Sequence, residues 1–212
     1  QNGFDTVYRF TPSTPWDMST LGSSDQSTTT NAQQTGSAAL TFSDDGTKMF
    51  IGGGGAGGEV DEYSLSTAWD ITTANDVDVL SVNSQETFVQ GLDFSSDGRK
   101  MFVSGNSSDV HQYNLPTAWD LTSASFVSQA TTSSEVGTGN GGAWGMALNE
   151  TGTQMFIVDY ATTPSARSEI FEYDIKIPWE MSSAVFVAST SISAQVSSPE
   201  DIEFSADGEK MY

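Results

Sequence analysis

One unit is repeated four times along this chain of 212 residues, and the repetition constrains the fold more than any single motif does. The first half of each unit follows the pattern Phe-Ser-x-Asp-Gly-x-Lys-Met-Phe, with variations, and its copies begin 52, 54 and 56 residues apart, at Phe42, Phe94, Leu148 and Phe204. In the second half an aromatic residue stands six positions before a Trp-Asp or Trp-Glu pair, and these pairs lie at 16–17, 69–70, 119–120 and 179–180. Repeats of this length indicate a solenoid or a propeller.

Within one repeat the pattern predicts four antiparallel strands. In the second unit we expect them at 89–94, 100–103, 110–115 and 125–130. The Ser-x-Asp-Gly between the first two is a tight-hairpin signal, and the second strand is apolar on both faces, as expected of a sheet sandwiched between neighbours. The acid of each Trp-Asp pair is expected to cap the backbone amide two residues ahead. Four strands in about 50 residues favour a propeller blade over helical repeats.

The sequence therefore predicts an all-β fold, a β-propeller of four-stranded antiparallel blades within a single domain, 1–212. Four blades are expected per chain, at about 37–84, 89–134, 143–193 and 199–212 plus 1–30. The last blade would be shared between the termini, because joining the ends places 19 residues from Phe204 to Phe10, against 20 from Phe94 to Tyr113. Two alternatives stay open: half of an eight-bladed ring formed by a dimer, and a fragment of a longer array.

Two strings carry a family resemblance: Phe-Ser-Ser-Asp-Gly-Arg-Lys-Met-Phe-Val at 94–103 and Tyr-Ser-Leu-Ser-Thr-Ala-Trp-Asp-Ile-Thr-Thr-Ala at 63–74. They resemble β-propeller repeats, similar in architecture to WD40-like and NHL-like blades, that occur in surface or secreted proteins of marine bacteria and in phage proteins. The resemblance implies a fold and an extracellular, cell-surface or virion-associated setting. It implies no catalytic residues.

The charge of the chain restricts its partners. A formal net charge of −21, from 28 acidic and 7 basic residues, argues against nucleic acid, because phosphate binding needs a positive surface. No apolar run approaches the roughly 20 residues of a membrane-spanning helix, so membrane insertion is not expected. Such acidity suits a salty extracellular medium, although it also serves solubility alone. The chain has no cysteine, which excludes disulfides and thiolate metal sites.

The candidate ligand site lies where the repeats differ. Hairpin connectivity places the second-to-third-strand loops and the loops between units on one side of the ring, and loops on a rigid scaffold commonly carry binding residues. Trp144, after a glycine-rich segment, stands at the repeat position that holds Ala38, Gln90 and Glu200 in other units. The predicted ligand-binding residues are Trp144, Gln90, Asn140, Glu200 and Asp201. An aromatic platform beside amides and carboxylates suits a sugar, although Trp144 would equally well plug the ring centre.

Metal binding and catalysis have weaker signals. Asp93 and Glu203 are candidate calcium ligands because they fall on the innermost strands, but no EF-hand pattern is present, so no cofactor is expected apart from calcium. The only histidine, His111, sits in a third strand and is predicted to be exposed rather than a general base. A pair of channel carboxylates could still hydrolyse glycosides.

The sequence thus favours an extracellular binding module, lectin-like or protein-binding, over an enzyme. A structural segment of a virion or cell-surface protein and a carbohydrate-active enzyme are the alternatives. The expected partners are a glycan or a surface protein, with a homodimer as a further possibility.

Overall fold

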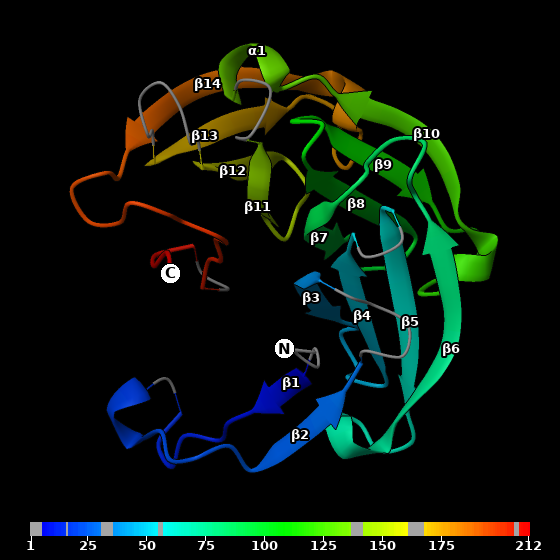
Figure 1. Cartoon of the computed structure of the whole chain (residues 1–212). Helices are drawn as coiled ribbons and strands as arrows, with labels where there is room; N and C mark the ends of the chain where they lie inside the picture. The colour runs from blue at the N-terminus through cyan, green and yellow to red at the C-terminus, as the bar shows by residue number, and fades with distance from the viewer. Residues whose placement is uncertain are drawn as a thin grey trace.

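The computed structural model describes residues 6–15, 17–30, 36–54, 57–136, 142–160, 168–205 and 208–212. The described strands form three four-stranded sheets and one two-stranded sheet, set around a common centre (Figure 1). The sheets are β3 (Ser37–Phe42), β4 (Lys48–Gly53), β5 (Glu59–Leu65) and β6 (Ala74–Ser81); β7 (Val89–Phe94), β8 (Lys100–Gly105), β9 (Val110–Asn114) and β10 (Ser125–Ala130); β11 (Ala143–Leu148), β12 (Gln154–Tyr160), β13 (Ser168–Ile175) and β14 (Ala184–Ser191); and β1 (Thr6–Arg9) with β2 (Gln26–Thr29). The predicted all-β propeller fold is confirmed.

Each four-stranded sheet is an antiparallel meander in chain order, with β3, β7 and β11 nearest the centre and β6, β10 and β14 at the rim (Figure 1). Short helices connect or follow the strands: η1 (Met18–Thr20), η2 (Ile71–Thr73), η3 (Leu121–Ser123), η4 (Met181–Ser183) and α1 (Ser133–Val136). Each of the four η helices follows a tryptophan-acid pair, so the pair marks the crossing from third to fourth strand in every unit.

The hydrophobic core lies between the sheets. One cluster joins Phe50 and Val60 of the first sheet to Met101 and Tyr113 of the second, and a second cluster joins the second sheet to the third in the same manner. Phe102, in the middle of β8, has no exposed surface. The second strands are therefore buried on both faces, as their apolar sequence predicts.

The hairpin between first and second strands is fixed by its aspartate. Asp45 Oδ1 accepts from the Thr47 amide at 2.9 Å and from the Ser43 hydroxyl at 2.8 Å. Gly46 has φ +67°, a left-handed conformation that glycine adopts at no steric cost. The predicted Asp-Gly turn is confirmed.

The tryptophan-acid turn matches its predicted cap in the described copies that carry aspartate. Asp17, Asp70 and Asp120 accept from the amide two residues ahead at 3.0–3.1 Å. Glu180 makes no such bond. Its longer side chain reaches the Lys100 ammonium of the preceding sheet instead, so the capping prediction is wrong for this copy.

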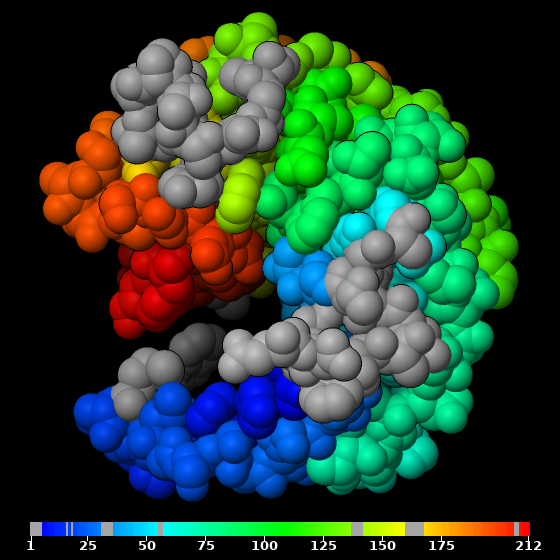
Figure 2. Space-filling view, in the orientation of Figure 1, coloured from blue at the N-terminus to red at the C-terminus, as the bar shows by residue number. Residues whose placement is uncertain are grey.

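The fourth unit is divided between the two ends of the chain. β1 and β2 form the two-stranded sheet, whereas the C-terminal hairpin is marked by a bridge between Phe204 and Met211. No strand pairing joins these halves within the described residues, and a gap separates them in Figures 1 and 2. Among the described residues the two halves of the fourth unit are therefore not paired, and the blade shared between the termini stays a prediction.

Candidate functional site

Each inner strand begins with an irregularity that the repeat did not predict. The pairing register shifts between Ser37 and Ala39, between Val89 and Gly91, and between Ala143 and Gly145. The residues skipped are those that the sequence aligned as equivalent: Ala38, Gln90 and Trp144. A β-bulge bends its strand and re-aims the side chain it carries, so the variable position of the repeat is also a distinct structural position.

Glycines after two of these bulges bring neighbouring inner strands together. A Cβ on Gly91 would stand 3.2 Å from the Trp144 carbonyl oxygen, and a Cβ on Gly145 would stand 2.4 Å from the Asp201 Cα. Close approach of this kind is a recognised use of glycine in strands. Three of the predicted ligand residues, Gln90, Trp144 and Asp201, therefore lie on or beside successive inner strands.

The accessibility of the predicted residues differs. Trp144 is half-buried and Glu200 is exposed, outside any described strand. Gln90 is only 9% exposed, and no described group donates a hydrogen bond to its buried Oε1. Asn140 lies outside the described residues. Trp144 and the acids at 200–201 are thus the parts of the predicted set that a ligand could reach.

The surrounding loops are held by a carboxylate that the sequence analysis missed. Glu86 has no exposed surface and accepts from the Phe88 amide at 3.0 Å and the Ser107 amide at 2.9 Å. A Cβ on Gly58 would lie 1.7 Å from the Glu86 carbonyl oxygen, so this loop wedges between the loops of two sheets. Glu86 occurs in one unit only, and no repeat signal could have found it.

The only histidine belongs to the same network, and its predicted exposure is wrong. His111 is 3% exposed, and its Nε2 lies 3.0 Å from the Ser107 hydroxyl. Burial lowers the pKa of its imidazole. Within the described residues Nδ1 has no hydrogen-bond partner, and Asp109 accepts from Gln129 and from the Thr132 amide. The contact between Ser107 and His111 thus belongs to the hydrogen-bonded network of these loops.

The acids of the inner strands serve mainly as backbone ties. Asp93 accepts from the Phe94 amide at 2.7 Å and from the Leu148 amide of the next sheet at 3.2 Å. Burial, together with the charges of Glu203 and Asp201, raises the pKa of Asp93 to about 7. Partial burial also raises the pKa values of Asp201 and Glu203.

Among the described residues, this arrangement does not bring Asp93 and Glu203 together with enough further ligands to hold a calcium ion. Both Asp93 oxygens already accept backbone hydrogen bonds. Across the part of the chain that the structure describes, no three His, Asp or Glu side chains gather closely enough to hold a metal ion. Calcium binding therefore stays a prediction.

Solved structures of β-propellers resemble this chain. The β-propeller domain of Cps50 (Swd1) from Myceliophteria thermophila superposes with a TM-score of 0.51 and 12% identity, covering 80% of this chain and 47% of that one. The WD40 repeats of RRP9 and the structure of U3-55K each give a TM-score of 0.46 at 12% identity, covering 74% of this chain and 38% and 39% of theirs. The chain spans less than half the length of these three structures. No family model and no curated protein matches it.

None of the helices among the described residues is long and apolar enough to span a bilayer.

Proposed function

We propose that this chain is an extracellular or surface-associated binding module, without catalytic activity, that holds its ligand on the loop face. We define the loop face as residues 83–88, 104–109 and 131–136 with the bulges at Gln90 and Trp144. The observation that supports this proposal is that Glu86 and Asp109 tie the loops to one another by accepting hydrogen bonds from backbone amides. A preorganised surface loses little entropy on binding.

The chemistry of the loop face suits a neutral polar ligand. Its exposed side chains are mainly amides and hydroxyls: Asn83, Ser84, Thr87, Asn106 and Thr131. Binding loops commonly combine such adaptable donors and acceptors with aromatic side chains. Phe88 and Trp144 supply half-buried rings here. A glycan is the ligand class that this combination fits best, with its apolar ring face on Trp144 and its hydroxyls on the amides and on Asp201.

A glycan array followed by calorimetric titration of any hit tests this function. We expect saturable binding that Trp144→Ala reduces at least about tenfold, since a stacked ring contributes on the order of 1 kcal/mol or more. Phe186→Ala is the matched control, because it removes an exposed ring on the outer strand β14, away from the loop face. If no glycan on the array binds, or if wild type and Trp144→Ala bind with equal affinity, the glycan proposal is contradicted.

A protein partner is the second candidate, and a specific surface favours it. The outer strands carry exposed apolar side chains: Val77, Val79, Phe126, Val127, Val185 and Val187. On each outer strand two of these side chains lie within two positions of each other in the sequence, and exposed apolar surface is a feature of protein interaction sites. The test is whether the immobilised protein retains a purified surface-protein fraction. Loss of retention in the double variant Val79→Lys and Val187→Lys, with retention unchanged in Trp144→Ala, would favour this role over glycan binding.

A further inference from the structure

The rim of the ring is formed by the outer strand of each complete sheet: β6, β10 and β14 (Figure 1). Among the described strands each of the three pairs with one neighbour only, so its other edge presents backbone amides and carbonyls. Proteins protect such edges with charged side chains, short strands, bulges or covering loops, because an open edge pairs readily with another extended chain. The three outer strands differ in the protection that they have.

A bulge at an equivalent valine is common to all three outer strands. The pairing register skips Val77 of β6, Val127 of β10 and Val187 of β14. These valines are 53%, 45% and 48% exposed. The second sheet lies between the first and the third (Figure 1), and its valine is as exposed as the other two. The exposure of these positions therefore belongs to the rim and does not depend on the open end of the ring.

Charge protects β6, and a short exposed length protects β10. β6 carries Asp76 and Asp78, one on each side of its bulge. β10 has six residues, and its last three are partly or fully buried. In that half Gln129 donates to Asp109 at 2.7 Å, which ties the end of β10 to the loop before β9.

β14 has neither form of protection. It is eight residues long, and all but its first residue are exposed. Its sequence, Ala-Val-Phe-Val-Ala-Ser-Thr-Ser, has no charged residue, and none occurs anywhere between Glu180 and Glu200. Val185, Phe186 and Val187 are 49%, 40% and 48% exposed. A long, uncharged and partly apolar edge is the kind to which an extended peptide adds as a further strand.

The edge of β14 is held firmly by its own sheet. The strand pairs with β13 from Ala184 to Ser191. The Phe186 ring lies 5.7 Å from that of Tyr173 and 6.5 Å from that of Phe171, between ring centres. η4, which directly precedes β14, packs against β10, so the start of β14 lies beside the second sheet. A fixed edge of this kind loses little entropy when a further strand binds.

The charges around the edge favour a basic occupant. β13 places Glu172 and Asp174 directly opposite Ala188 and Val185 of β14. Lys176 pairs with Asp174 at 2.8 Å. The whole chain has a formal net charge of −21, so it repels a second copy of itself and attracts a positively charged segment.

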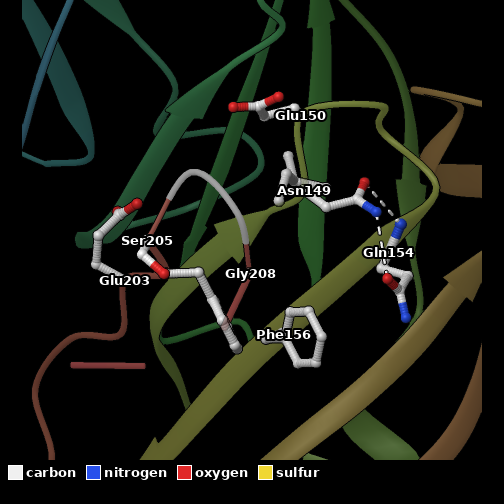
Figure 3. A pocket seen from close by; sticks show the side chains of 9 residues that line it. Asn149, Glu150, Gln154, Phe156, Glu203, Ser205 and Gly208 are labelled. Atoms are coloured by element: carbon white, nitrogen blue, oxygen red, sulfur yellow. Dashed lines mark hydrogen bonds between the residues drawn. The ribbon is translucent and has the colours of Figure 1, made fainter. Parts of the chain in front are cut away.

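The pocket between the third sheet and the C-terminal hairpin offers no such edge. It has a volume of about 430 Å³, and Gln154 and Phe156 of β12 line it (Figure 3). β12 is paired on both sides, with β11 and with β13, so its backbone groups are already used. β12 therefore presents side chains to this pocket, whereas β14 presents backbone donors and acceptors at the rim.

We propose that β14 is the docking edge for an extended, positively charged segment of a partner protein, which adds to the third sheet as a fifth strand. Main-chain hydrogen bonds along the edge supply affinity, and alternate side chains of the segment pack beside the apolar start of β14. The proposal rests on the protein-binding candidate function, to which it gives a strand, a binding mode and a charge. It is independent of glycan binding on the loop face.

A synthetic peptide tests strand addition. The probe is a dye-labelled peptide of alternating valine and threonine with lysine at both ends, and fluorescence anisotropy follows its binding. We expect saturable binding that Val187→Lys weakens at least about tenfold, since a lysine at the edge repels a basic strand. Val77→Lys is the matched control, because it changes the equivalent bulge valine of β6 and should leave the affinity unchanged.

Two altered peptides separate main-chain pairing from general attraction. Methylation of the peptide's backbone nitrogens removes the donors that pair strands and should abolish binding. Glutamate in place of the lysines should weaken binding at least about tenfold. With the lysine peptide bound, we expect slower hydrogen exchange of the amides of β14 and unchanged exchange in β6.

Three results would overturn the proposal. The first is that the lysine peptide does not bind, or that its methylated form binds equally well. The second is an equal loss of affinity in Val187→Lys and Val77→Lys. The third is a wild-type dimer that Val187→Lys converts to a monomer in light scattering, because a second copy would then occupy the edge. The retention experiment with the surface-protein fraction decides separately whether the outer strands bind a protein.

Discussion

At the scale of single residues, three tryptophans adopt a left-handed backbone conformation that bulky side chains rarely take. Trp69, Trp119 and Trp179 have φ of 63°, 60° and 64°. The conformation lets each ring cover the hairpin glycine of its own unit, and the tryptophan amide donates to that glycine's carbonyl at 2.8–2.9 Å. The partial burial of Trp119 and Trp179 against the core compensates this strain, whereas the ring of Trp69 is half exposed.

Gly98→Ala tests this arrangement. The new Cβ would stand 2.2 Å from Trp119 Nε1 and would impose a side chain on φ of +66°. We expect a loss of at least about 2 kcal/mol in the free energy of unfolding, measured by urea denaturation. Gly22→Ala, whose Cβ meets nothing within 4 Å, should lose far less; similar losses in the two variants would contradict the account.

The raised pKa of Asp93 predicts how the stability of the protein depends on pH. Its folded-state pKa of about 7 lies above the ordinary value of 3.8, so the carboxyl ionises more readily in the unfolded chain. The stability that the protonated group contributes is present below about pH 4 and is lost as the pH rises toward 7. We expect thermal melts to show a smaller decrease in Tm between pH 4.5 and 7.5 for Asp93→Asn than for wild type.

The control for this experiment is an aspartate with the opposite shift. The hydrogen bond from Ser95 lowers the pKa of Asp97, so its stabilising charge is already present at pH 4.5. Asp97→Asn should therefore lower Tm at both pH values and leave the difference between them unchanged. If Asp93→Asn behaves in the same manner, Asp93 does not titrate in this range.

At the scale of elements, one acceptor in the third strand of each of the first two sheets ties that sheet to the next. Glu62 performs this role between the first and second sheets and Gln112 between the second and third. In the repeat, Glu62 and Gln112 stand at the same position, directly before the aromatic residue of the third strand. The repeat does not indicate that each of them contacts the following blade. A contact across units cannot be read from local periodicity.

The second sheet has Gln112 at the position of Glu62, so substitutions of Glu62 test the contact between sheets. Glu62→Gln keeps an acceptor for the Leu121 amide, as Gln112 does for Met181, but it loses the ion pair to Lys48, so we expect a smaller loss than for Glu62→Ala. Glu62→Ala leaves the buried Leu121 amide without its acceptor and removes the ion pair of Lys48, whose ammonium keeps only the Trp119 carbonyl, and it should cost on the order of 2–3 kcal/mol. Chemical denaturation measures both variants; equal losses would show that the tie between sheets contributes little.

At the scale of the whole molecule, charge opposes compactness. The formal net charge of −21 repels itself, and the screening length falls from about 10 Å at 0.1 M salt to 3 Å at 1 M. We expect Tm to rise between these concentrations of NaCl, measured by calorimetry. Sulfate is avoided because it strengthens apolar burial directly. A Tm that is constant or falls with NaCl would show that self-repulsion does not limit stability.

The sequence alone determined the blade and its repetition. Strand periodicity, Asp-Gly turns and aspartate caps are local, so the repeated pattern predicted 89–94 and 125–130 as strands with the observed bounds. It also identified Gln90, Trp144 and Glu200 as related positions, because they align across units. Only the tertiary structure showed the bulges there, the burial of Gln90 and His111, and the role of Glu86. These features depend on contacts between strands and loops of the folded chain, such as that of Glu86 with Ser107, which the repeated pattern does not contain.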